Sequence, residues 1–140
     1  MVRRIFGAVG LVALVATTPG LAQAAKKGSK EPMAQGRPLS AWVADLKALS
    51  PQTRNAAAYA ISGMGPAGAP AVPALIEALG DSSPAVRYPV TVALREIGPA
   101  AKTAVPALKK LMDEDINDEI ASSARRAIRK IDPAALTDDE

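Results

Sequence analysis

The stretch GPAGAPAVPAL, residues 65–75, recurs at residues 98–108 as GPAAKTAVPAL, with eight of eleven positions identical. Around this stretch, segments 50–66, 83–99 and 117–133 align with one another at a nearly constant offset. Self-similarity at such a period is typical of repeat proteins, in which each unit buries its apolar face against the next unit. We therefore interpret the duplicated stretch as the connection between successive units.

Each aligned segment has the apolar spacing of one face of an α-helix. In the second segment, this face consists of Val86, Val90, Ala93, Leu94 and Ile97. Ser50, Ser83 and Asn117 precede the three long helices and are expected to act as N-caps. Gly65 and Gly98 follow the first two helices, where a left-handed C-cap favours glycine. Pro89, inside the second helix, lacks an N–H group and is expected to cause a kink or a late helix start.

Shorter apolar helices are expected between the long ones, at residues 41–49, 72–79 and 105–112. The first would be capped by Ser40 and would present Trp42, Val43, Leu46 and Leu49 to the core. The alternation of short and long helices predicts an all-α fold. The predicted architecture is a short right-handed α-solenoid of about three helical hairpins, spanning residues 39–133.

Residues 1–24 are typical of a secretory signal peptide, because two arginines precede an apolar run and AQA at residues 22–24 offers a cleavage site. The apolar run at residues 5–16 is shorter than the ~20 residues that cross a bilayer. Cleavage is therefore favoured over an uncleaved membrane anchor. The sequence predicts a protein exported to the periplasm or the extracellular space, without stable membrane insertion after cleavage.

Residues 25–38 lack an apolar period and are rich in Lys, Gly and Pro, so they are interpreted as a flexible linker. Residues 134–140 form an acidic tail. The chain has 17 basic and 14 acidic residues, and removal of the signal peptide would take away two of the basic ones. Nucleic acid is not expected as the partner, because its binding needs a clustered basic face.

The chain contains no cysteine and no histidine. Thiol nucleophiles, disulfides, imidazole acid–base catalysis and His-ligated metals are therefore excluded. The acidic run DEDINDE at residues 113–119 departs from a calcium-binding loop, because Asp118 stands where glycine is needed and Ala124 where a bidentate Glu is needed. We expect no metal, no cofactor and no catalytic residue.

Asp81 and the stretch SPAVRYPVTVALREIGPAAKTAVPALKKL, residues 83–111, together resemble the short HEAT repeat of the group called PBS-lyase HEAT-like. GRPLSAWVADLKAL, residues 36–49, resembles the opening helix of exported bacterial HEAT proteins. The resemblance implies a structural ladder of Asp and Arg side chains that links the units. In this sequence only Asp81 and Arg87 make a complete motif, since Arg54 has no matching Asp and Asp115 has Ala121 in place of Arg. We therefore expect an interrupted ladder.

The long helices carry a second row of matched positions, which in HEAT-like stacks lines the concave side. Its candidate partner-binding residues are Tyr88, Thr91, Arg95, Arg125 and Arg129. This row predicts a non-catalytic scaffold that binds a protein partner. Two alternatives remain open from the sequence: an accessory lyase-like or chaperone-like factor acting on a bound substrate, and a binder of polyanions.

Overall fold

The computed structural model describes residues 31–137. The predicted signal peptide lies outside the described residues, and so do residues 25–30 of the predicted linker and residues 138–140 of the predicted tail. The description that follows concerns residues 31–137 alone.

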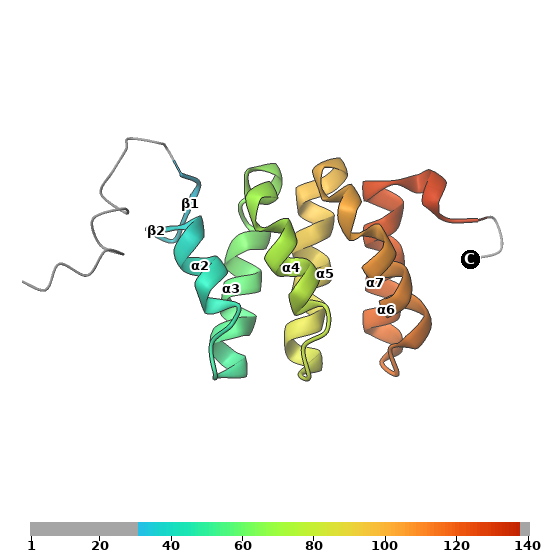
Figure 1. The fold of residues 1–140 in the computed structure, drawn as a ribbon, viewed down its shortest axis with the longest axis horizontal. Helices are drawn as coiled ribbons and strands as arrows, with labels where there is room; N and C mark the ends of the chain where they lie inside the picture. Colours follow the sequence, from blue (N-terminus) through green and yellow to red (C-terminus); the bar gives the residue numbers. More distant parts are fainter. Residues whose placement is uncertain (1–30, 138–140) are drawn as a thin grey trace, which may run out of the picture. The chain divides into compact units, whose positions relative to one another are not determined.

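The described chain is an all-α stack of helical hairpins, as the sequence predicts (Figure 1). The first helices of the hairpins are α2 (Leu39–Asp45), α4 (Val72–Ala78) and α6 (Val105–Glu114). The second helices are α3 (Pro51–Ser62), α5 (Pro84–Ile97) and α7 (Asp118–Ile131). Helix α5 packs against both α3 and α7, so the second helices form a row. This row of packed helices forms one layer of the stack.

The apolar face predicted for each long helix forms the core. Leu94 and Ile128 are completely buried, and so is Ile61 in the first unit. These side chains meet the buried residues of the first helices, such as Leu75 and Leu108. One core prediction is wrong: Leu49 is fully exposed, because α2 ends at Asp45 and Leu49 lies in the turn that follows.

The duplicated stretch folds as two 3-10 segments, Gly65–Ala71 and Gly98–Ala104, which join successive units. Gly98 has a φ of +77° and closes α5, as predicted. Gly65 also has a positive φ, +55°, but α3 ends earlier, at Ser62, and is followed by Gly63. Gly65 therefore begins the 3-10 segment instead of capping the helix.

The N-caps are confirmed for two of the three long helices. The Ser50 hydroxyl accepts a hydrogen bond from the Thr53 N–H at 3.4 Å. The Asn117 side chain accepts from two backbone N–H groups of α7, at 3.0 and 3.3 Å. The prediction for Ser83 is wrong: its side chain makes no capping bond, and its own N–H donates to Asp81 Oδ1 at 2.9 Å. The carboxylate thus holds the turn before α5.

Helix α5 begins at Pro84 and continues through Pro89, so the predicted late start is wrong. A proline N has no hydrogen to give to the carbonyl four residues earlier, which here belongs to Ala85. The side chain of Asn55, on α3, donates a hydrogen bond to that carbonyl. The neighbouring helix therefore supplies the donor that Pro89 lacks.

The prediction of a flexible linker is wrong for residues 31–38. Strands β1 (Met33–Ala34) and β2 (Arg37–Pro38) pair in an antiparallel hairpin. Gln35 and Gly36 form its two-residue turn with φ values of 53° and 75°, the positive pair that a tight hairpin turn prefers. The sequence does not predict this hairpin, because each strand has two residues and is too short to show the alternation of a β-strand.

The hairpin is held to α2 by side chains. The Trp42 indole donates to the carbonyl of Ala34 at 3.1 Å, and the Arg37 guanidinium lies 4.1 Å from the centre of the Trp42 ring. Arg37 also pairs with Asp45 at 2.8 Å. The Ser40 cap is absent, because α2 begins at Leu39. A Glu31 carboxylate oxygen instead accepts from the Ser40 N–H at 2.5 Å.

Candidate functional site

Two arginine–aspartate rungs join the three units. Arg54 pairs with Asp81 through two parallel hydrogen bonds, from Nε to Oδ2 at 2.6 Å and from Nη2 to Oδ1 at 3.0 Å. Arg87 pairs with Asp115 in the same way, at 2.7 and 3.2 Å. The planar guanidinium matches a carboxylate in this bidentate geometry. Each arginine therefore pairs with the acid of the following unit.

This staggered pairing corrects the expectation of an interrupted ladder. Arg54 finds its acid in the second unit and Asp115 finds its base there, so both interfaces carry a complete rung. Asp81 and Arg87 do not pair through their side chains; Arg87 Nη1 donates instead to the backbone carbonyl of Asp81 at 2.8 Å. The two positions without a ladder partner, Ala48 and Ala121, are the matching positions in the first and third units.

The rungs lower the pKa of both aspartates. The hydrogen bonds from Arg87 hold the pKa of Asp115 below its ordinary value, against the opposing effect of burial. For Asp81, burial is the largest influence and raises the pKa, but Arg54 and the Ser83 N–H together hold the pKa below its ordinary value. The pKa of Arg54 is raised by its hydrogen bond to Asp81. Both acids are therefore anions and not proton donors at neutral pH.

The side of the second helices that faces away from the first helices is called here the outward face. It carries aromatic, aliphatic and arginine side chains at matching repeat positions. Three of the predicted partner-binding residues, Tyr88, Arg95 and Arg129, lie on rows of this face. The sequence interpretation missed a further row between them. That row consists of Tyr59 on α3, Val92 on α5 and Arg126 on α7, which share one repeat position. Tyr59 and Arg126 are exposed and Val92 is half-buried.

Thr91 does not belong to this face, which corrects the prediction. It is completely buried between α5 and α7, where its hydroxyl lies 2.6 Å from the Ser123 hydroxyl. The Thr91 hydroxyl also donates to the Tyr88 carbonyl at 2.7 Å. The matching residue of the first unit, Ala58, is buried in the same way. This repeat position therefore packs one unit on the next.

Arg125 occupies that same packing position in the last unit. Its counterparts Ala58 and Thr91 are completely buried, whereas Arg125 is exposed. Arg125 therefore lies on the end of the stack of described helices and not on the shared outward face. It lies beside a shallow hollow that also involves Met112 and Ala121.

The outward face becomes more basic from α3 to α7. The charge of Arg54 on α3 is taken up by the ladder, and Arg95 on α5 pairs with Glu96 at 3.0 Å. Among the described residues, Arg126 and Arg129 on α7 make no ion pair within 4 Å. Tyrosine and arginine are among the residues most enriched at the energetic centres of protein interfaces. The α7 end of this face therefore presents exposed cations that make no ion pair with another described residue.

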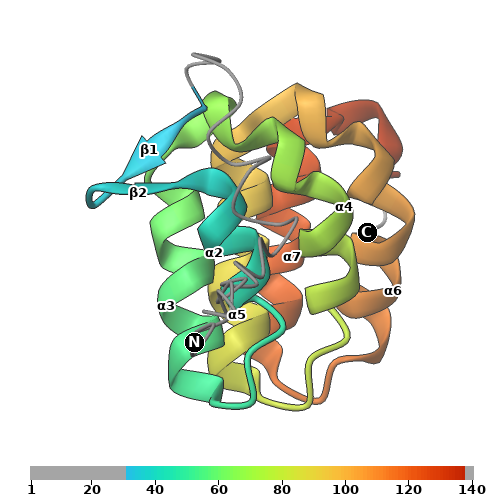
Figure 2. The same cartoon turned by 60° about the vertical axis from the view of Figure 1, so that its left-hand side comes forward.

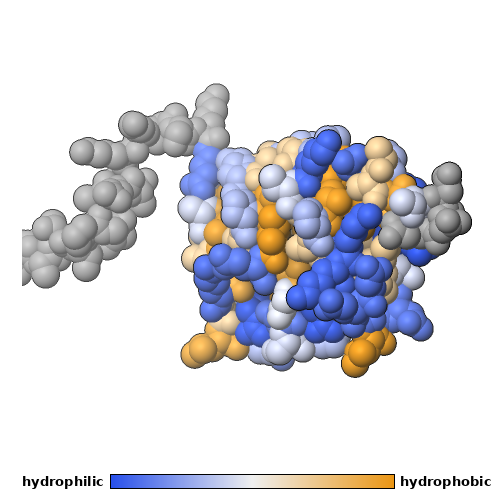
Figure 3. Space-filling view, turned by 45° about the vertical axis from the view of Figure 1, so that its right-hand side comes forward, coloured by the Kyte–Doolittle hydropathy of each residue, from blue (hydrophilic) through white to orange (hydrophobic). Residues whose placement is uncertain are grey.

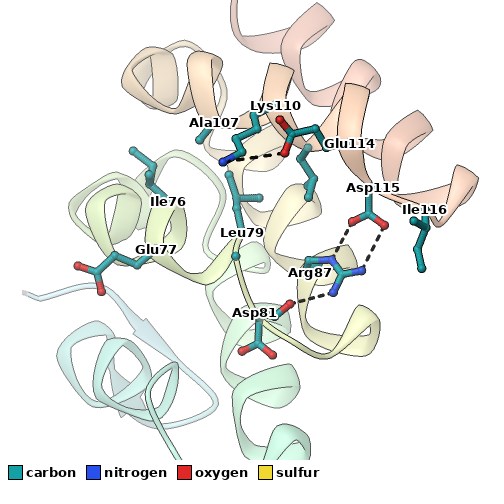
Figure 4. A pocket seen from close by; sticks show the side chains of 12 residues that line it. Ile76, Glu77, Leu79, Asp81, Arg87, Ala107, Lys110, Glu114, Asp115 and Ile116 are labelled. Atoms are coloured by element: carbon teal, nitrogen blue, oxygen red, sulfur yellow. Dashed lines mark hydrogen bonds and ion pairs between the residues drawn. The ribbon is translucent and has the colours of Figure 1, made fainter.

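The opposite side of the stack carries a groove of about 460 Å³ between α4 and α6. Figure 3 shows a hydrophobic strip between hydrophilic areas on this side. Apolar side chains of the groove include Ile76, Leu79 and Leu111. In Figure 4 the Lys110–Glu114 pair lies on one side of the groove and the Arg87–Asp115 rung on another. Four acids line this groove: Asp81 and Asp115 are engaged by the ladder arginines, and Glu77 and Glu114 pair with Lys47 and Lys110.

Within residues 31–137 no cluster of three acidic side chains is arranged to hold a metal ion. No helix in the same range is long and apolar enough to cross a bilayer. Every buried side-chain polar atom of the described residues has a hydrogen-bond partner. The polar groups of the described interior thus serve the packing of helices.

Stacked helix pairs, a repeated core and one ionic rung at each interface define an α-solenoid repeat protein. A family model of HEAT repeats matches residues 39–129, nearly the whole helical stack. The chain belongs to the HEAT-repeat family. A search of curated proteins found no match to the chain.

Proposed function

We propose that this protein is an exported, non-catalytic scaffold that binds an acidic segment of a protein partner on the outward face of α3, α5 and α7. HEAT repeats are generally protein-interaction scaffolds. The observation that carries the proposal is the row of Tyr59, Val92 and Arg126, flanked by Tyr88 and Arg129. This row combines rigid aromatic contact area with arginines that lack an internal partner among the described residues.

Export is the second part of the proposal. It is supported by the signal-like segment at residues 1–24, with its arginine pair, apolar run and AQA site. We also propose that the units are of the short, PBS-lyase HEAT-like type found in exported bacterial proteins. The sequence marks of that type are the Asp–Arg spacing and the stretch IGPAAKTAVPAL, residues 97–108.

A polyanion is the second candidate ligand, and one observation favours it. Arg125, Arg126, Arg129 and Lys130 are all exposed on α7. A polyanion would follow the charge alone, whereas a protein segment would also need the aromatic contacts of Tyr59 and Tyr88. The enzymatic alternative has no such support, because the ladder acids are engaged and the sequence has neither Cys nor His.

A charge-reversal pull-down tests the proposal. The full chain and the variant Arg126→Glu/Arg129→Glu are expressed with a tag and exposed to the exported fraction of the source cells. The matched control is Lys102→Glu/Lys110→Glu, which makes the same charge change at two exposed lysines away from this face. We expect one dominant partner with wild type and the control, and its loss with the arginine variant.

Two further variants separate the ligand classes. Tyr59→Ala and Tyr88→Ala remove contact area without changing charge, so they weaken binding of a protein partner and leave retention on heparin unchanged. Equal partner recovery by wild type and the arginine variant would contradict the proposed face. Heparin retention well above that of a protein of equal charge, with no protein partner recovered, would favour the polyanion. Detection of residues 1–24 in the mature protein by mass spectrometry would contradict cleavage of the signal peptide, and recovery of the protein from the cytoplasm alone would contradict export.

A further inference from the structure

The last unit ends the described stack with a surface that differs from the interfaces inside the stack. Figure 2 shows the helices in two layers, of which α6 and α7 are the last described members. In the second unit, Ile76 on α4 packs against the core and Thr91 on α5 is completely buried. The matching residues of the last unit are Lys109 and Arg125. Two packing positions of the repeat therefore carry cations where the described stack ends.

A shallow hollow of about 250 Å³ lies on this end surface, between α6 and α7. Its lining consists of Met112, Ala121, Ser122, Arg125 and Arg126. Lys130, also on α7, pairs with Glu96 at 3.7 Å, whereas Arg125 and Arg126 make no ion pair within 4 Å with a described residue. A guanidinium group binds a carboxylate through parallel hydrogen bonds, and a serine hydroxyl is a further donor. The hollow therefore offers donors for carboxylate groups.

The chain after α7 stays at this end of the stack. The 3-10 segment η3 (Pro133–Ala135) contacts α7, and Figure 1 shows it on the side of α7 that faces away from α5. Leu136 is half-buried against the core, so the chain is held beside the last helix up to this residue. The sequence continues after Thr137 with three acidic residues, called here the tail acids: Asp138, Asp139 and Glu140.

The tail acids have the length to run back along α7 to the hollow. An extended residue spans about 3.3–3.6 Å, so three residues span about 10 Å. An α-helix rises 1.5 Å per residue, which places Arg126 and Arg125 about 7.5 and 9 Å along the axis from Ile131, the last residue of α7. The arginines of the hollow are therefore within reach of a segment that begins beside the end of α7.

Other occupants fit the end surface less well. A second copy stacked head to tail would bring its first unit, in which α3 has no acidic residue and Asp45 of α2 is already paired with Arg37 at 2.8 Å. A separate acidic protein would compete with the tail acids, whose short tether gives them an effective concentration on the order of millimolar. Charge and tether together select the chain's own tail.

We propose that Asp138, Asp139 and Glu140 dock on the α6–α7 end of the same chain, with their carboxylates on Arg125 and Arg126. The tail then supplies the polar cover that the terminal unit of a repeat array needs. The docking is intramolecular, so it does not depend on the protein partner proposed above and can be tested without that partner.

Backbone relaxation measured by NMR on the full chain tests the docking. Amide order parameters are about 0.85 for a rigid backbone and below about 0.6 for a flexible one. We expect values above about 0.7 for the tail acids in wild type and below about 0.6 in Arg125→Glu/Arg126→Glu. The matched control is Lys47→Glu/Lys110→Glu, which makes the same charge change at two exposed lysines outside the hollow and is expected to leave the tail ordered.

Three results of this experiment would overturn the proposal. The first is a wild-type tail with order parameters below about 0.6. The second is a tail that is equally ordered in wild type and in Arg125→Glu/Arg126→Glu, because a contact elsewhere would then hold it. The third is order that is lost on dilution, because intramolecular docking is independent of protein concentration and such a loss would place the tail of a second copy in the hollow.

A double-mutant cycle in urea gives an independent readout. Asp138→Asn/Asp139→Asn/Glu140→Gln is expected to lower the unfolding midpoint by about 0.5 M in the wild-type background. In an Arg125→Ala/Arg126→Ala background the same change is expected to have no effect, because the partners of the tail acids are already gone. About 1 M salt, which screens charges beyond roughly 3 Å, should remove the shift in the wild-type background. Equal shifts in the two backgrounds would overturn the proposal.

Discussion

Removal of one charge from the Arg87–Asp115 rung is expected to destabilise the protein by about 3 kcal/mol. The Asp115 side chain is 2% exposed and that of Arg87 is 14% exposed, so solvent screens the pair little. Breaking a buried pair by removing one partner costs about 3–5 kcal/mol, because the other charge stays buried. The low end applies to Asp115→Asn, since the amide oxygen still accepts one hydrogen bond and Arg87 keeps the carbonyls of Asp81 and Ser82.

Urea unfolding measures this effect. With a slope of about 1.5 kcal/mol per molar urea, typical of a small domain, the midpoint of Asp115→Asn should fall by about 2 M. Asp113→Asn is the matched control, because it removes the same charge from an exposed side chain two residues earlier and should shift the midpoint by less than about 0.3 M.

The same experiment reports where the stability is lost. Trp42 is the only tryptophan and lies in the first unit, whereas the rung joins the second and third units. In a one-dimensional array, weakening one interface lets the terminal unit unfold first. We expect circular dichroism to fall at lower urea than Trp42 fluorescence in Asp115→Asn, and both signals to coincide in wild type. Indistinguishable midpoints for Asp115→Asn and Asp113→Asn would refute the reasoning.

Three further outcomes are expected. Asp81 and Asp115 have pKa values in the folded protein below the ordinary 3.8, so the ladder stabilises the protein fully above that pH. This contribution is lost as the pH falls through the lowered pKa values. Urea midpoints measured from pH 7 to pH 2 should therefore fall in wild type and change much less in an Asp81→Asn/Asp115→Asn variant. Asn55→Ala should cost about 0.5–1.5 kcal/mol by removing the hydrogen bond to the exposed Ala85 carbonyl, and Pro89→Ala in the same chain should recover part of this loss by restoring the N–H, as a double-mutant cycle in urea would show. Leu94→Ala should lower the free energy of unfolding by about 3 kcal/mol, because the side chain is completely buried; a loss below about 1 kcal/mol would contradict its place in the core.

The helical core could be predicted from the sequence because its signal repeats. Residues such as Val90, Leu94 and Ile128 recur at helical spacing in aligned segments, and each segment supports the interpretation of the others. The hairpin at residues 33–38 could not be predicted in this way. Two-residue strands have no measurable period, and their stability comes from contacts with Trp42 and Asp45 on a later helix.

The sequence predicts the residues of the ladder but not their pairing. The pairing of Arg54 with Asp81 joins two units and depends on how one unit lies on the next, which spacing within one motif does not reveal. The polar side chain of Thr91 favours a surface position when it is considered alone. The matching residue of the first unit is Ala58, and this alanine is the sequence feature that indicates a buried position. The hydroxyl of Ser123 is the hydrogen-bond partner that allows Thr91 to be buried.

The stagger of the ladder has a consequence for how the copy number of the array can change. Each interface takes its base from one unit and its acid from the next, and the alanines at positions 48 and 121 leave the two outermost ladder positions uncharged. A gene duplication or deletion that adds or removes a middle unit, which carries both an acid and a base as Asp81 and Arg87 do, would therefore add or remove one base and one acid together. No buried charge is left without its partner, so the number of repeat units can change during evolution at little electrostatic cost.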